Sequence, residues 1–138
     1  MRECGGAATL TWKGPPAAGP LKDREEIETT AGEAAALARI LERLGFQPVF
    51  RYEKFRTAFA GPDGGGEAVL DETPIGCFLE LEGPPEWIGK NAQALGFSAD
   101  KYITDSYAAL YFKDCARRGV EPGHMVFGGP GRAIGGLP

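Results

Sequence analysis

The chain has 138 residues, and its 43% hydrophobic content is enough for one modest core, so we predict a single domain. Its net charge of -4 lacks the basic excess that bulk nucleic-acid binders need. No apolar run approaches the roughly 20 residues of a membrane-spanning helix, and the N-terminus lacks the apolar segment of a secretory signal. Three scattered cysteines argue against a disulfide framework, which favours a reduced, cytoplasmic compartment.

Alternation of polar and apolar residues with a period of two predicts strands along much of the chain. The expected strands are Thr9–Lys13, Arg24–Thr30, one over residues 49–59, a short one holding Val69 and Asp71, and one over residues 77–82. A last short strand is expected at Met125–Phe127. The Gly/Pro-rich end, residues 128–138, is predicted to be a flexible tail, so the predicted domain covers residues 1–127.

Three amphipathic helices are expected between these strands. The first begins at Thr30, which forms a capping-box pattern with Glu33. Its apolar residues recur at helical spacing at Leu37, Ile40, Leu41 and Leu44. The others cover about residues 85–95 and 105–118, and a glycine follows each helix. The pattern as a whole predicts an α+β fold in which the helices pack outside an antiparallel sheet.

The strands carry their ionisable residues on one face, and acids and bases fall largely on different strands. For any single strand, an amphipathic sheet with its polar face in water explains this pattern. For the whole set we favour a barrel with an inward charged face, because a bound polyanion with divalent cations would compensate the charges. Lys and Arg hold phosphate oxygens. Two carboxylates two residues apart on a strand suit one Mg²⁺ or Mn²⁺.

Four stretches occur in an order that resembles one known family. They are LTWKGP at 10–15, REEIET at 24–29, YEKFR at 52–56 and LDETPIGCFLELEG at 70–83. The chain resembles the CYTH family, the triphosphate tunnel enzymes, and within it the class IV adenylyl cyclases. The resemblance covers roughly residues 8–127. Its strength lies in the order of the motifs and in the length of the last one, since each short motif alone occurs by chance.

The resemblance implies an eight-stranded antiparallel tunnel with a charged interior. It carries phosphate-binding roles to Lys13, Lys54 and Arg56, with assistance from Arg24. It carries metal-binding roles to Glu80 and Glu82, and acidic positions of the tunnel wall to Glu26, Glu28 and Asp71. Family members act on ATP, thiamine triphosphate or inorganic triphosphate with Mg²⁺ or Mn²⁺. No side chain is assigned as catalytic, because cyclisation of ATP requires no side-chain nucleophile.

Three hypotheses for function stay open at this point. The first is a class IV adenylyl cyclase that converts ATP to cAMP and pyrophosphate with a divalent metal. The second is a triphosphatase on the same scaffold, acting on thiamine triphosphate or inorganic triphosphate. The third is a non-catalytic protein that binds polyphosphate or nucleotides. None of the three needs a nucleic-acid or membrane partner.

One departure from the family concerns its first strand, which carries an E-x-E-x-K pattern. Here Glu3 stands alone in the string RECGG. The tunnel of this chain is therefore expected to be incomplete, and the sequence leaves three explanations open: a wrongly assigned start, a fragment, or a true truncation. An incomplete tunnel has an exposed sheet edge. Unpaired backbone groups at such an edge tend to recruit another chain, which predicts a dimer or a strand-swapped oligomer.

Overall fold

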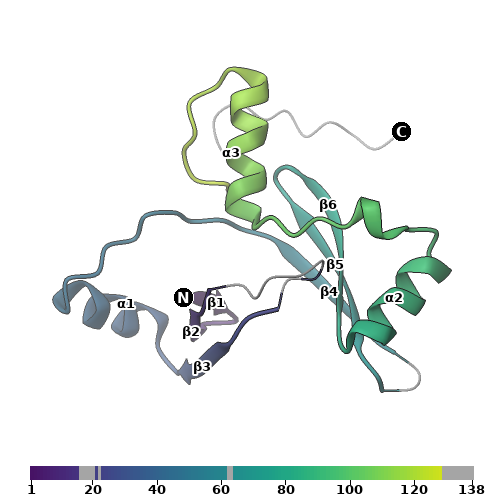
Figure 1. Ribbon diagram of the computed structural model, residues 1–138. Helices are drawn as coiled ribbons and strands as arrows, with labels where there is room; N and C mark the ends of the chain where they lie inside the picture. Colours follow the sequence, from purple (N-terminus) through teal and green to yellow (C-terminus); the bar gives the residue numbers. More distant parts are fainter. Residues whose placement is uncertain (16–20, 22, 62–63, 129–138) are drawn as a thin grey trace. The chain divides into compact units, whose positions relative to one another are not determined.

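The computed structural model describes residues 1–15, 21, 23–61 and 64–128. It divides into two compact units, Met1–Val49 and Phe50–Pro138, which are described separately below (Figure 1). Whether the units form the one domain expected from the sequence stays a prediction. The expected tail, residues 128–138, lies outside the described residues except for Gly128. In the part of the chain that the structure describes, no helix is long and apolar enough to cross a bilayer.

The first unit contains a three-stranded antiparallel sheet followed by one helix. Its elements are β1 (Arg2–Cys4), β2 (Ala7–Lys13), β3 (Glu26–Ala31) and α1 (Ala34–Arg43). The strands lie in the order β1-β2-β3, and α1 contacts β2. Gly5 and Gly6 join β1 to β2 with φ values of 58° and 84°. A two-residue hairpin with both residues at positive φ favours this pair of glycines.

One strand of this unit was not predicted, and one predicted helix start was wrong. The unpredicted strand is β1, although the Gly-Gly pair before an alternating stretch is a hairpin signal. Thr30 does not cap the first helix, because it lies within β3 and pairs with Thr9. The N-cap of α1 is Glu33, whose side chain makes no capping hydrogen bond. Strand pairing with β2 therefore holds Thr30 in extended backbone, and the helix begins after the strand ends.

The second unit contains another three-stranded antiparallel sheet and two longer helices. Its elements are β4 (Phe55–Ala60), β5 (Glu67–Thr73), β6 (Gly76–Glu82), α2 (Pro85–Ala94), a short 3₁₀ helix (Ala99–Lys101) and α3 (Tyr107–Arg118). The helix α3 begins after Ser106, whose hydroxyl accepts a hydrogen bond from the Ala109 N–H at 3.2 Å. It ends at Gly119, with φ at 66°. Both predicted helices of this unit are confirmed to within two residues.

The chain on either side of β4 differs from the expectation. Residues 51–54 lie outside β4, and the expected final strand is a single parallel bridge between Tyr52 and Met125. The Glu53 N–H donates to the Met125 carbonyl at 2.9 Å, and the Met125 N–H donates to the Arg51 carbonyl at 3.0 Å. Met125 is fully buried. These contacts attach the segment after α3 to the chain that leads into β4.

In the sheet β4–β5–β6, the face that carries the charges is buried at its centre, along β5. Val69 and Asp71 lie on that face, and both are fully buried. The opposite face presents Phe55 and Phe59, which are 66% and 54% exposed. A simple amphipathic sheet would have the reverse arrangement. Two antiparallel sheets and three α-helices confirm the α+β class. The tunnel expected from the sequence stays a prediction.

Candidate functional site

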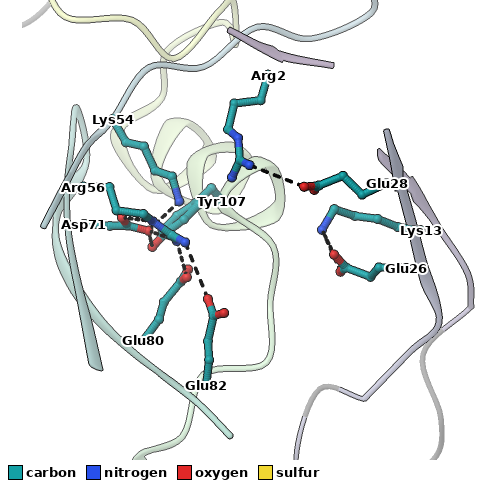
Figure 2. A network of polar contacts seen from close by, with 10 residues as sticks. All are labelled: Arg2, Lys13, Glu26, Glu28, Lys54, Arg56, Asp71, Glu80, Glu82 and Tyr107. Carbon is teal, nitrogen blue, oxygen red and sulfur yellow. Dashed lines mark hydrogen bonds and ion pairs between the residues drawn. The ribbon is translucent and has the colours of Figure 1, made fainter. Parts of the chain in front are cut away.

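Six polar residues of the second unit gather on one face of its sheet, and we call them the Asp71 cluster (Figure 2). They are Lys54, Arg56, Asp71, Glu80, Glu82 and Tyr107. The strand register explains most of this gathering, because Arg56 lies opposite Asp71, and Glu80 lies opposite Val69, two residues before Asp71. Directly opposed residues on antiparallel strands share a face. Tyr107 joins them from the start of α3.

The Asp71 carboxylate is fully buried and accepts hydrogen bonds from three side chains. Lys54 Nζ donates at 2.6 Å, Arg56 donates through Nε at 2.8 Å and Nη2 at 2.7 Å, and the Tyr107 hydroxyl donates at 2.8 Å. Burial alone would raise the pKa of Asp71, but these hydrogen bonds outweigh it and lower the pKa to about 2. Asp71 is therefore an anion at any physiological pH.

Arg56 connects Asp71 to the two acids of β6. Its guanidinium makes a bidentate contact with Asp71, donates to Glu80, and lies 3.5 Å from Glu82. The hydrogen bond to Asp71 raises the pKa of Arg56 despite partial burial, with further help from Glu80. The side chains of Glu80 and Glu82 are 34% and 56% exposed, whereas that of Asp71 is fully buried. Solvent can therefore reach the two glutamates but not the aspartate.

The two glutamates of β6 are the residues of this cluster best suited to a divalent cation. They lie two residues apart on one face of the strand, and hard cations take carboxylate oxygens. Among the described residues, no group of three or more His, Cys, Asp or Glu side chains could hold a metal ion. Mg²⁺ commonly binds through one or two carboxylates together with substrate phosphates and water. The pair could therefore supply two carboxylate ligands to a divalent cation whose other ligands are water or phosphate oxygens.

The first unit holds a second, more exposed set of ion pairs, which we call the Lys13 cluster. Its members are Lys13, Arg24, Glu26 and Glu28 (Figure 2 shows three of them). Lys13 lies opposite Glu26 in the sheet and donates to its carboxylate at 2.6 Å, and Arg24 donates to the same carboxylate at 2.9 Å. The hydrogen bonds from Lys13 and Arg24 lower the pKa of Glu26. Exposed pairs of this kind contribute about 0–1 kcal/mol to stability.

Glu28 has partners of its own in this sheet. Its carboxylate accepts a hydrogen bond from the Thr11 hydroxyl at 2.9 Å and lies 3.9 Å from the Arg2 guanidinium. Arg2 was not among the predicted site residues, because it lies in the unpredicted strand β1. The wall positions predicted at Glu26 and Glu28 are thus paired with cations at the surface of their sheet.

Comparisons with known proteins identify the family of this chain. The family model described as "CYTH domain" matches residues 1–107, which run across both units. The chain belongs to the CYTH family. A Methanocaldococcus jannaschii protein named "putative adenylate cyclase" is 31% identical over 121 residues, which cover 80% of this chain and 68% of that protein. No solved structure gives a significant match.

This CYTH chain brings together all five acids and bases that the sequence predicted in the second unit, with Glu82 at the edge of the group. Lys13 and Arg24 lie together in the first unit around Glu26. Their roles toward phosphate and metal stay predictions. Tyr107, like Arg2, was not among the predicted site residues. No spacing rule links Tyr107 to Asp71, 36 residues earlier.

Proposed function

We propose that this CYTH protein is a metal-dependent adenylyl cyclase that converts ATP to cAMP and pyrophosphate. The observation that carries the proposal is the Asp71 cluster, where two cations held by a buried carboxylate lie beside two solvent-accessible carboxylates. The name of the archaeal relative supports a cyclase over the other reactions of the family. An antiparallel tunnel of the family's kind, incomplete as the sequence predicts, is part of this proposal.

In this proposal Lys54 and Arg56 bind phosphate oxygens of ATP. Asp71 uses one donor of Lys54 and two nitrogens of Arg56, which leaves other N–H groups for a ligand. Charge-assisted contacts of this kind are the stronger class of hydrogen bonds. Lys13, assisted by Arg24, is proposed to contribute further phosphate contacts. The common feature of these four residues is a cation already oriented by a neighbouring carboxylate.

Glu80 and Glu82 are proposed to hold the divalent cation, Mg²⁺ or Mn²⁺. The bound cation would neutralise charge on the triphosphate and stabilise charge that develops at the reacting oxygens. Glu80 and Glu82 contact Arg56 in the structure, so we expect them to exchange this contact for the metal when the triphosphate engages Arg56. Asp71 would keep its contacts throughout, because it is buried and already satisfied by three side chains.

The chemistry proposed needs positioning more than a protein nucleophile. The ribose 3′ oxygen forms a bond to the α-phosphorus, the bond from the α-phosphorus to the bridging oxygen breaks, and pyrophosphate leaves. The proton of the 3′ hydroxyl passes to solvent. Cations aimed at the leaving pyrophosphate stabilise its developing charge, which is the contribution we assign to Lys54 and Arg56. No side chain is assigned as a general base.

The test is product analysis with the purified protein, ATP and Mg²⁺ or Mn²⁺. We expect cAMP and pyrophosphate in equal amounts, and a loss of roughly 100-fold or more in turnover for the double variant Glu80→Gln, Glu82→Gln. The matched control is Glu72→Gln with Glu121→Gln, which changes the charge equally. Glu72 lies on the opposite face of β5, and Glu121 is exposed after α3.

Two outcomes would replace the cyclase proposal by another hypothesis, and a third would refute the metal-binding role. Inorganic phosphate without cAMP would replace the cyclase proposal with the triphosphatase. Binding of ATP without any product would favour the non-catalytic hypothesis. Turnover at the parent rate in the Glu80, Glu82 double variant would refute the metal-binding role of this pair, whatever the product.

A further inference from the structure

Tyr107 contacts Lys54, the Asp71 carboxylate that pairs with Lys54, and the ring of Phe78. Its hydroxyl donates to Asp71 at 2.8 Å, and Asp71 is also the acceptor for Lys54. The Lys54 ammonium lies over the Tyr107 ring, 5.2 Å from the ring centroid. The edge of Phe78 packs against the same ring, with centroids 5.2 Å apart. One aromatic side chain thus touches both the ammonium and the counter-ion of that ammonium.

The ring restricts a side chain that would otherwise be mobile. Lysine carries a compact charge on a flexible four-carbon stem, so a single ion pair leaves it many orientations. Here the ammonium has the Asp71 carboxylate on one side at 2.6 Å and the π-face of Tyr107 on another. The Lys54 side chain is only 15% exposed. Its remaining N–H groups can therefore point in few directions.

Tyr107 is itself held by contacts that do not involve Lys54. It is the first residue of α3, directly after the Ser106 cap, and its ring contacts Phe78 of β6 and Tyr52. These contacts fix the position of the ring, and with it the hydroxyl that donates to Asp71, before any ligand arrives.

We propose that Tyr107 is a positioning residue for triphosphate binding, which acts by holding Lys54 against Asp71 so that the remaining N–H groups of Lys54 face the ligand. The inference rests on the proposed function for its ligand, a triphosphate. It assigns to the start of α3 a role that goes beyond packing against the sheet. Tyr107 need not touch the substrate for this role.

The first experiment measures the dissociation constant of inorganic triphosphate with Mg²⁺ by calorimetry. We expect Tyr107→Leu to weaken binding about 5- to 10-fold, and Tyr107→Phe, which keeps the ring, to weaken it less. Tyr111→Leu is the matched control on the same helix. Tyr111 packs on Phe50 and accepts a hydrogen bond from the Gly123 N–H, away from Lys54. Equal affinity in the Tyr107→Leu variant and the parent would overturn the proposal.

A double-mutant cycle separates positioning from general loosening of the fold. Tyr107→Leu is combined with Lys54→Met, and triphosphate binding is measured for all four forms. If Tyr107 acts through Lys54, its substitution adds little once the ammonium is gone. A loss in the double variant equal to the product of the two single losses would overturn the proposal.

A third measurement needs no ligand. An amine-acylating reagent is applied to the unliganded protein, and the labelling of each lysine is followed by mass spectrometry. Lys54 is expected to react several-fold faster in Tyr107→Leu than in the parent, while Lys101, which is 68% exposed, serves as the internal standard. Unchanged labelling of Lys54 would overturn the inference. If the parent fails to bind triphosphate, the proposed function fails, whereas the labelling still decides whether Tyr107 holds Lys54.

Discussion

Replacing Asp71 by asparagine should remove the anion that holds the cluster together while keeping the size of the side chain. The pKa of Asp71 is about 2, compared with an ordinary value of 3.8. A difference of this size corresponds to about 2.4 kcal/mol of folding stability at neutral pH. Because the folded-state pKa is lowered, this stability is present above about pH 3.8 and is lost as the pH falls toward 2. By pH 3 about half of it should be gone.

The substitution also leaves Lys54 and Arg56 without their shared counter-ion. Removing one partner of a fully buried ion pair costs about 3–5 kcal/mol. The Lys54 and Arg56 side chains are 15% and 30% exposed, so solvent recovers part of that cost. We therefore expect Asp71→Asn to lower the free energy of unfolding by about 2–4 kcal/mol at pH 7.

The assay is urea unfolding followed by the fluorescence of Trp87, in a Trp12→Phe background because Trp12 belongs to the other unit. Asp105→Asn is the control, since Asp105 pairs with Lys113 at 2.6 Å where both side chains are exposed. That change should cost about 0–1 kcal/mol. The difference in free energy of unfolding between the parent and Asp71→Asn should shrink by about 1 kcal/mol between pH 7 and pH 3. A difference that does not change with pH, or an Asp71→Asn variant as stable as Asp105→Asn, would refute the reasoning.

Two further predictions concern packing and phosphate binding. Gly66→Ala should lower the free energy of unfolding by about 1–3 kcal/mol, because the added Cβ would lie 2.6 Å from the Trp87 ring and 2.7 Å from the Glu82 carbonyl. Gly89→Ala is the control, since a Cβ there meets no atom within 4 Å. Equal unfolding midpoints for the two variants would contradict the prediction. Lys13→Ala should weaken triphosphate binding by one charge-assisted contact, about 1.5–3 kcal/mol, yet lower thermal stability little because its ion pair is exposed. Calorimetry and melting curves measure both effects, and unchanged affinity would remove Lys13 from the phosphate-binding set.

The sequence could predict which strand residues share a face, because that follows from a period of two. Arg56, Asp71 and Glu80 lie on one face as the alternation requires, and their pairing register brings them into contact. The sequence could not predict the contribution of α3. Tyr107, the first residue of α3, reaches Asp71 through a tertiary contact, and a helix period says which residues are apolar but not which strand they meet.

The boundaries that were wrong have the same origin. Thr30 and Glu33 satisfy the local pattern of a capping box, but the ladder between β2 and β3 engages Thr30 first. Residues 51–54 alternate like a strand, yet they lie outside one and pair with the segment at Met125 by a single bridge. In both cases a long-range backbone pairing overrides a local preference. Pairing partners of this kind are not visible in one sequence.

The carboxylates of the Asp71 cluster differ in how readily they can change partners, and this difference links the fold to the proposed chemistry. Asp71 has no exposed surface and three donors, so exchanging it for a ligand would leave buried charges unpaired. Glu80 and Glu82 are partly in water, so losing Arg56 to a phosphate costs them far less. A site that must bind an anion and a cation together needs both kinds. In the proposed site, the buried acid would keep the two cations in place when the ligand is absent, and the two accessible acids would be free to leave Arg56 and hold the metal.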